Sequence, residues 1–87
     1  MLQPKILFVE PLPDYKLFLK YETNEQKIFD VTPYISGDWF GKLKDSAYFN
    51  TVRLSGNTVE WQGGQDIAPH ELYELSAHYS NERKFKT

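Results

Sequence analysis

The chain has 87 residues, of which 40% are hydrophobic and 16% aromatic, and its formal net charge is −2. This composition is typical of one globular domain and not of a disordered chain. The weakly negative charge excludes a general attraction to nucleic acid or anionic membranes, and the lack of cysteine excludes disulfides, zinc–thiolate sites and a cysteine nucleophile.

The first third of the chain predicts an antiparallel three-stranded meander. Residues 5–10 contain a continuous apolar run, which is typical of a strand buried on both faces, and two prolines then end it. Residues 15–21 alternate, with Leu17 and Leu19 on one face, and a polar turn follows. Residues 26–32 form the predicted return strand.

An aromatic-rich connection follows the meander. Thr32 and Pro33 predict the N-cap and first position of a short helix that Gly37 ends. Within the less regular stretch 38–45 two hypotheses stay open for Trp39 and Phe40. Either these rings turn inward and plug one end of the core, or they stay on the surface as part of an interface.

A second hairpin is predicted next. Asp45 or Ser46 can cap a short helical turn, after which residues 51–54 and 58–61 read as strands joined by a glycine turn. Trp61 is in phase with the apolar positions of its strand, so we expect it to be largely buried between this hairpin and the C-terminal helix.

The end of the chain predicts an amphipathic helix. Pro69 suits its first position after the Gly63–Gly64 turn. Residues at helical spacing predict that it continues to Tyr79, with one apolar stripe formed by Ala68, Leu72, Leu75 and Tyr79. Residues 80–87 lack such periodicity. We therefore expect a single α+β domain over residues 1–79, with antiparallel meander, short helical connection, second β-hairpin and C-terminal helix, and a flexible tail over residues 80–87.

The sequence contains no pattern that predicts catalysis. His70 and His78 lie eight residues apart without flanking carboxylates at metal-ligand spacing, and neither a phosphate-binding glycine loop nor a nucleophile elbow is present. We expect a non-enzymatic protein without catalytic residues, metal or cofactor. Since the sequence has neither a secretory signal nor a long apolar run, we expect a cytoplasmic protein that does not bind membranes.

Four stretches together resemble the bacterial domain-of-unknown-function family 2442. They are residues 9–17, residues 28–31, the loop with Phe40 and Leu43 before Asp45, and residues 61–74. Family members are small bacterial proteins of unestablished function. Some carry an additional DNA-binding domain, to which the resemblance does not extend, and some are encoded in gene pairs that look like toxin–antitoxin loci.

These observations favour a protein-interaction module, with an antitoxin-like regulator of a small partner protein as its more specific form. The residues expected to bind that partner are Tyr34, Trp39 and Phe40, because aromatic side chains on a connection often dominate interfaces. The alternative is a nucleic-acid-contacting accessory protein that uses its lysines and the basic residues 83–86, which the net charge disfavours. A homodimer remains open.

Overall fold

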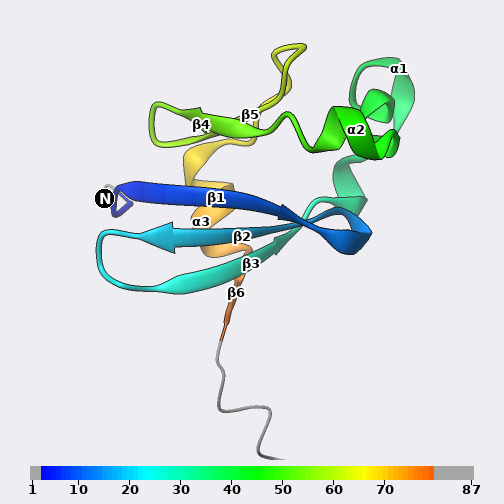
Figure 1. The fold of residues 1–87 in the computed structure, drawn as a ribbon. Helices are drawn as coiled ribbons and strands as arrows, with labels where there is room; N and C mark the ends of the chain where they lie inside the picture. Colours follow the sequence, from blue (N-terminus) through cyan, green and yellow to red (C-terminus); the bar gives the residue numbers. More distant parts are fainter. Residues whose placement is uncertain (1–2, 80–87) are drawn as a thin grey trace, which may run out of the picture.

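An antiparallel sheet of four strands, in the order β1-β2-β3-β6, forms one side of the molecule, and a separate hairpin of β4 and β5 lies beside it (Figure 1). The computed structural model describes residues 3–79, so the predicted tail lies outside the described residues. The strands are β1 (Ile6–Leu12), β2 (Lys16–Tyr21), β3 (Gln26–Asp30), β4 (Arg53–Ser55), β5 (Thr58–Glu60) and β6 (Ala77–His78).

The helical segments of residues 3–79 are all short. The α-helices are α1 (Gly37–Phe40), α2 (Ser46–Phe49) and α3 (Pro69–Glu74), and the 3₁₀ segments are η1 (Pro13–Tyr15), η2 (Thr32–Tyr34) and η3 (Gly41–Lys44). This mixture of antiparallel sheet and helices confirms the predicted α+β class. No helix within residues 3–79 is both long and apolar enough to cross a membrane.

The central strand β2 carries the alternation that the sequence predicts. Leu17, Leu19 and Tyr21 are buried, whereas the residues between them are partly exposed. In β3, Phe29 is buried on the same side, next to Leu17 in the register. One face of the sheet therefore supplies half of a two-layer core, and helix α3 lies behind it in Figure 1.

Strand β1 departs from the prediction of burial on both faces. Ile6 is buried, but Leu7 and Phe8 are 51% and 46% exposed. The register with β2 shifts between Ile6 and Phe8, which is a β-bulge. A bulge adds one extra residue to the strand. The side chains of an apolar run that contains a bulge therefore no longer alternate regularly between the buried and the exposed face of the sheet. The strand also extends through Pro11 to Leu12, which an edge strand tolerates, since its outer N–H groups need no ladder partner.

The predicted helix through Tyr79 is also wrong. Helix α3 begins at Pro69 as expected but ends at Glu74, and Leu75 is 65% exposed. The chain then becomes extended, and β6 pairs with β3 as a fourth strand. Of the predicted stripe only Leu72 is buried, because six residues give little helical stability of their own and the sheet edge offers new backbone partners.

The aromatic connection is more helical than expected. Gly37 does not end a helix but begins α1, with a φ of 73°, and the 3₁₀ segment before it already ends at Tyr34. The prediction of a capped turn is confirmed, because the Asp45 carboxylate accepts a hydrogen bond from the backbone N–H of Ala47 at 3.0 Å.

Trp61 is completely buried, as predicted, and joins three parts of the fold. Its indole Nε1–H donates to the carbonyl oxygen of Phe49 at 2.8 Å, and the two rings pack with centroids 5.7 Å apart. The indole therefore links the residue after β5 to the end of α2, within a core that also contains Leu72 of α3.

We predict that Trp61→Ala lowers the free energy of unfolding by about 3–5 kcal/mol, because it leaves a large cavity in the core. Chemical denaturation followed by circular dichroism would measure this change. Trp61→Phe is the matched control, since it keeps an aromatic ring but loses the bond to Phe49, and it should cost less. A cooperative melt of Trp61→Ala within a few degrees of wild type would contradict the prediction.

Candidate functional site

The three residues predicted to bind a partner have different environments. Trp39 is 53% exposed, whereas Phe40 is half-buried and packs against the core. Their rings lie 5.6 Å apart. Tyr34 is half-buried, packs on Phe29 at 5.6 Å and donates its hydroxyl to Glu71 at 3.1 Å. The expectation of an inward ring therefore fits Phe40, and Trp39 presents the accessible aromatic surface.

The backbone that carries Trp39 is fixed by Gln65, a fully buried polar residue that sequence reasoning missed. The side-chain Nε2 of Gln65 donates to the carbonyl oxygen of Trp39 at 2.8 Å. Its Oε1 accepts a hydrogen bond from the hydroxyl of Tyr48 at 2.9 Å. The side-chain amide of Gln65, in the turn after β5, thus forms hydrogen bonds with two groups of the helical connection. A buried network in which every polar group is hydrogen-bonded holds its members rigidly.

The glycines before Gln65 allow this close approach. A side chain at Gly63 would overlap the hydroxyl of Tyr48. Gly64 has a φ of 96°, which disfavours other residues, and a Cβ there would lie 3.9 Å from the ring of Trp39. The Gly63–Gly64 pair predicted a turn from the sequence. Only the structure shows that this turn leaves room for the Tyr48 hydroxyl and borders the exposed indole of Trp39.

Burial raises the pKa of the Tyr34 hydroxyl, and its hydrogen bond to Glu71 raises it further. The phenol therefore remains a neutral donor at physiological pH, and it ties the connection to helix α3. Tyr34 thus supports the connection that carries Trp39, and only part of its side chain is accessible to a partner.

We predict that Gln65→Met lowers the free energy of unfolding by about 1–3 kcal/mol, because Tyr48 and the Trp39 carbonyl lose a buried partner. Acrylamide quenching should also show a more mobile indole at Trp39, since Trp61 is buried and contributes little to quenching. Gln62→Met is the matched control at an exposed position of the same turn and should change stability by less than about 0.5 kcal/mol. Equal stability of both variants would contradict this role of Gln65.

A second polar cluster lies where α3 and β6 meet the β2–β3 turn. The ammonium of the buried Lys27 donates to the carbonyl oxygen of Tyr73 at 2.6 Å and lies 3.9 Å from the centre of that ring. The Tyr73 hydroxyl donates to Glu25 at 2.8 Å, and His78 approaches the same carboxylate at 3.8 Å. Each group is occupied with another protein group, so the cluster is structural in character.

The neighbouring Tyr21 hydroxyl has no hydrogen-bond partner within the described residues. Burial raises the pKa of Tyr21 to about 12, with smaller contributions from Tyr73 and Glu25. A phenol with this pKa stays protonated at neutral pH and is a poor general base. Tyr21 is therefore not poised for acid–base catalysis at neutral pH.

We predict a pH dependence that arises from Glu25. Hydrogen bonds from Thr23 and then from Tyr73 hold the pKa of the Glu25 carboxyl below its ordinary value of 4.5. Because the folded-state pKa is lowered, Glu25 stabilises the fold fully above pH 4.5, and this contribution is lost as the pH falls through the folded value. Thr23→Ala and Tyr73→Phe should each raise the pKa, as measured by carbon NMR of the carboxyl group. The same pKa in wild type and both variants would contradict this explanation.

A shallow groove of about 460 Å³ lies between the β1–β2 turn and α2. Asp14 and Tyr15 adopt positive φ angles of 64° and 62°, which cost about 1–2 kcal/mol per residue outside glycine. Tyr15 is held by a hydrogen bond from its hydroxyl to the Lys44 carbonyl at 2.6 Å and by edge-on packing with Phe49. The groove contains one carboxylate, that of Asp14, and the hydroxyl of the other ionisable residue in its lining, Tyr15, is already bonded to the Lys44 carbonyl.

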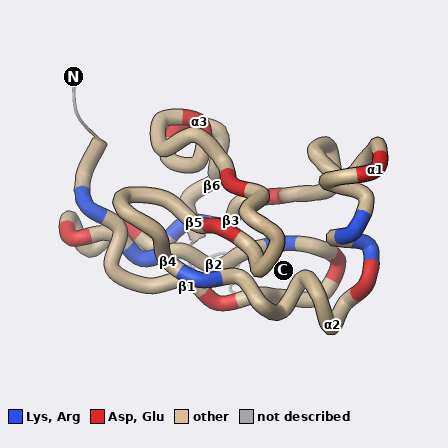
Figure 2. The backbone as a smooth tube through the Cα atoms, turned by 90° about the horizontal axis from the view of Figure 1, so that it is seen from above, with Lys and Arg blue, Asp and Glu red and all other residues tan. Residues whose placement is uncertain are grey.

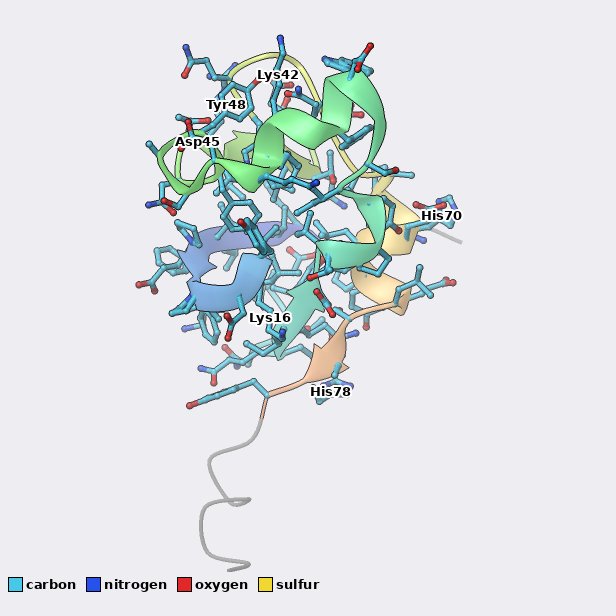
Figure 3. All side chains as sticks on the ribbon, turned by 90° about the vertical axis from the view of Figure 1, so that its right-hand side faces the viewer. Lys16, Lys42, Asp45, Tyr48, His70 and His78 are labelled. Atoms are coloured by element: carbon cyan, nitrogen blue, oxygen red, sulfur yellow. The ribbon has the colours of Figure 1, made fainter. Side chains whose placement is uncertain are left out.

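Within residues 3–79, no three acidic or histidine side chains are grouped as metal ligands would be. Figure 3 shows His70 on α3 and His78 on β6, apart from each other, while Asp45 and Tyr48 belong to the helical connection at the top. Figure 2 shows lysine and arginine positions interspersed with acidic positions along the described part of the chain.

The family model described as "Protein of unknown function (DUF2442)" matches residues 6–78. No curated protein matches the chain, and no protein of solved structure does. The family match covers most of the chain. It includes the bulged strand β1, the turn with positive φ angles at Asp14 and Tyr15, the Gly63–Gly64 turn and β6. The chain therefore belongs to the DUF2442 family.

Proposed function

We propose that this member of the DUF2442 family is a non-enzymatic protein-interaction module that binds its partner through Trp39. The observation that carries the proposal is a half-exposed indole on a backbone fixed by a buried hydrogen bond. A rigid aromatic side chain loses little conformational entropy on binding, and tryptophan is enriched among residues that dominate binding energy.

The surroundings of Trp39 support a protein partner. Phe40 extends the aromatic surface, and Gly63 and Gly64 leave the neighbouring backbone open because both are exposed and carry no side chain. Asp38 and Lys42 give the rim both signs of charge. An apolar centre with a mixed polar rim is the usual anatomy of a protein interface.

The nucleic-acid alternative has less support. Arg53 is paired with Glu60 at 2.6 Å, and Lys27 is buried against Tyr73. Lys42 and Lys44 lie in η3, but they share the connection with Asp38 and Asp45. Phosphate binding requires several cations that act together along a groove or strip, and the interspersed charges in Figure 2 favour a protein partner instead.

The matched pair Trp39→Ala and Leu75→Ala tests the proposal. Both side chains are exposed, but Leu75 lies after α3 and away from the glycine turn. Each variant should lower the free energy of unfolding by no more than about 1 kcal/mol. In quantitative affinity capture from the native host, Trp39→Ala should reduce one stoichiometric protein about tenfold or more, which corresponds to at least about 1.4 kcal/mol. Leu75→Ala should retain it.

If the two variants capture the same proteins in equal amounts, Trp39 is not the binding residue. If nuclease treatment removes the Trp39-dependent material, the ligand is a nucleic acid and the alternative function holds. A loss of several kcal/mol of stability in Trp39→Ala would instead assign Trp39 to the core.

The more specific form of the proposal is an antitoxin-like regulator whose partner is the product of an adjacent gene. If that product arrests growth when expressed alone, co-expression of the wild-type chain should relieve the arrest, and Trp39→Ala should relieve it less. Normal growth with the adjacent product alone would remove this specific form while leaving the interaction module intact.

A further inference from the structure

The sheet has an outer face that no other described element covers. In Figure 1 no helix or strand passes in front of β1, β2 and β3, while α3 lies behind them. The strand registers arrange the outward positions as a grid of three rows. These rows are Phe8, Lys20, Gln26 and Tyr79; then Glu10, Phe18, Ile28 and Ala77; then Leu12, Lys16 and Asp30.

An aromatic ladder runs through the centre of this face. Phe18 lies in the middle of the grid and is contacted edge-on by Phe8, with ring centroids 6.2 Å apart, and by Tyr79, at 5.7 Å. Ile28 is the cross-strand partner of Phe18. Phe8 and Tyr79 remain 46% and 37% exposed, so the ladder is ordered by its own contacts but is not covered.

Along the strands of an antiparallel sheet, apolar residues on the core face usually alternate with polar residues on the solvent face. Here the apolar residues are contiguous across all four strands instead of scattered singly. Contiguous exposed apolar surface of this kind marks an interaction site. It is separate from Trp39, which lies in α1 at the opposite end of the drawn fold from β6 (Figure 1).

The charged residues beside the ladder indicate what kind of partner fits the outer face of the sheet. Glu10 and Lys20 lie on either side of the diagonal that joins Phe8 to Phe18 in the grid. Neither forms an ion pair within residues 3–79, where the ion pairs are Arg53–Glu60 and His78–Glu25. A two-fold axis in the plane of the face, along that diagonal, exchanges the positions of Glu10 and Lys20. In a face-to-face pair each Glu10 then faces the Lys20 of the other copy, in an isologous interface. Asp30 is the next position on the same diagonal and faces the Asp30 of the other copy, with its cross-strand partner Lys16 beside it.

We propose that a second copy of this chain covers the outer face, and that the two sheets pack through the Phe8 and Phe18 rings of the ladder. The axis along the diagonal makes the strands of the two sheets cross steeply, which is one of the two common modes of sheet-on-sheet packing. The ladders supply the apolar burial, and the two Glu10–Lys20 contacts fix the orientation of the copies.

Sedimentation equilibrium of the full chain tests the proposal across the micromolar concentration range. Wild type should reach twice the 10.2 kDa mass of one chain. Phe18→Ser should weaken association at least tenfold, because it removes the central ring. Leu75→Ser is the matched control, since it changes an exposed apolar residue away from the face, and it should dimerise like wild type. Circular dichroism verifies that both variants are folded.

Charge exchange tests the orientation of the two copies. Glu10→Lys alone and Lys20→Glu alone each place like charges opposite one another and should weaken the dimer at least tenfold. The double variant restores opposite pairs and should associate within about threefold of wild type, which only the proposed pairing predicts. Trp39→Ala should dimerise normally, so failure here is separable from failure of the proposed partner binding.

Three results would overturn the proposal. A wild-type chain that remains monomeric throughout the concentration range has no such dimer. A chain truncated after Tyr79 that dimerises when the full chain does not would show that residues 80–87 occupy the face. A dimer that survives Phe18→Ser, or one that the double charge exchange does not restore, uses another surface or another orientation.

Discussion

The hydrogen bonds of the turn formed by residues 61–65 hold together the parts of the structure around it. Trp61 bonds to the end of α2 through its indole, and its backbone N–H bonds to the carbonyl of Gln65 at 2.8 Å. Gln65 in turn bonds to Trp39 and Tyr48. Helices of four residues, such as α1 and α2, have too few internal hydrogen bonds to be stable alone. Their position is therefore set by this buried turn.

The same dependence on tertiary contacts explains the other end of the molecule. Helix α3 has six residues and no side-chain cap at its N-terminus. It is held by the buried Leu72 and by Tyr73, whose carbonyl and ring both contact Lys27. A buried ammonium is costly unless it is paired. Its partners fix α3 against β3, and from there the chain reaches the sheet edge that becomes β6.

Much of the fold was predictable where a local pattern coincided with its tertiary role. The alternation of β2, the Asp45 cap and the start of α3 at Pro69 all have strong local signals. The errors arose where tertiary contacts override such patterns. The helical spacing of Leu75 and Tyr79 was real, but β3 offered backbone partners that ended the helix.

The first strand shows a different limit of sequence reasoning. A continuous apolar run indicates burial on both faces, but a bulge between Ile6 and Phe8 produces the same pattern with two exposed residues. The candidate site had the same ambiguity. Sequence reasoning selected Trp39 and Phe40 together but could not tell which one faces the core, and nothing in the pattern distinguished the buried Gln65 from the exposed Gln62.

The two proposed surfaces suit each other because they lie on different layers of the molecule. Trp39 belongs to the helical connection, which Gln65 fixes to the turn after β5, whereas the aromatic ladder belongs to the outer face of the four-stranded sheet. Association through the sheets would leave both copies of Trp39 accessible. A dimer then presents two identical binding surfaces, and a partner that is itself dimeric could engage both at once if their spacing matches. Such bivalent binding can exceed the single-site affinity by about 10²–10⁴ without any new contact. A modest surface around one indole would then be sufficient for tight and selective binding.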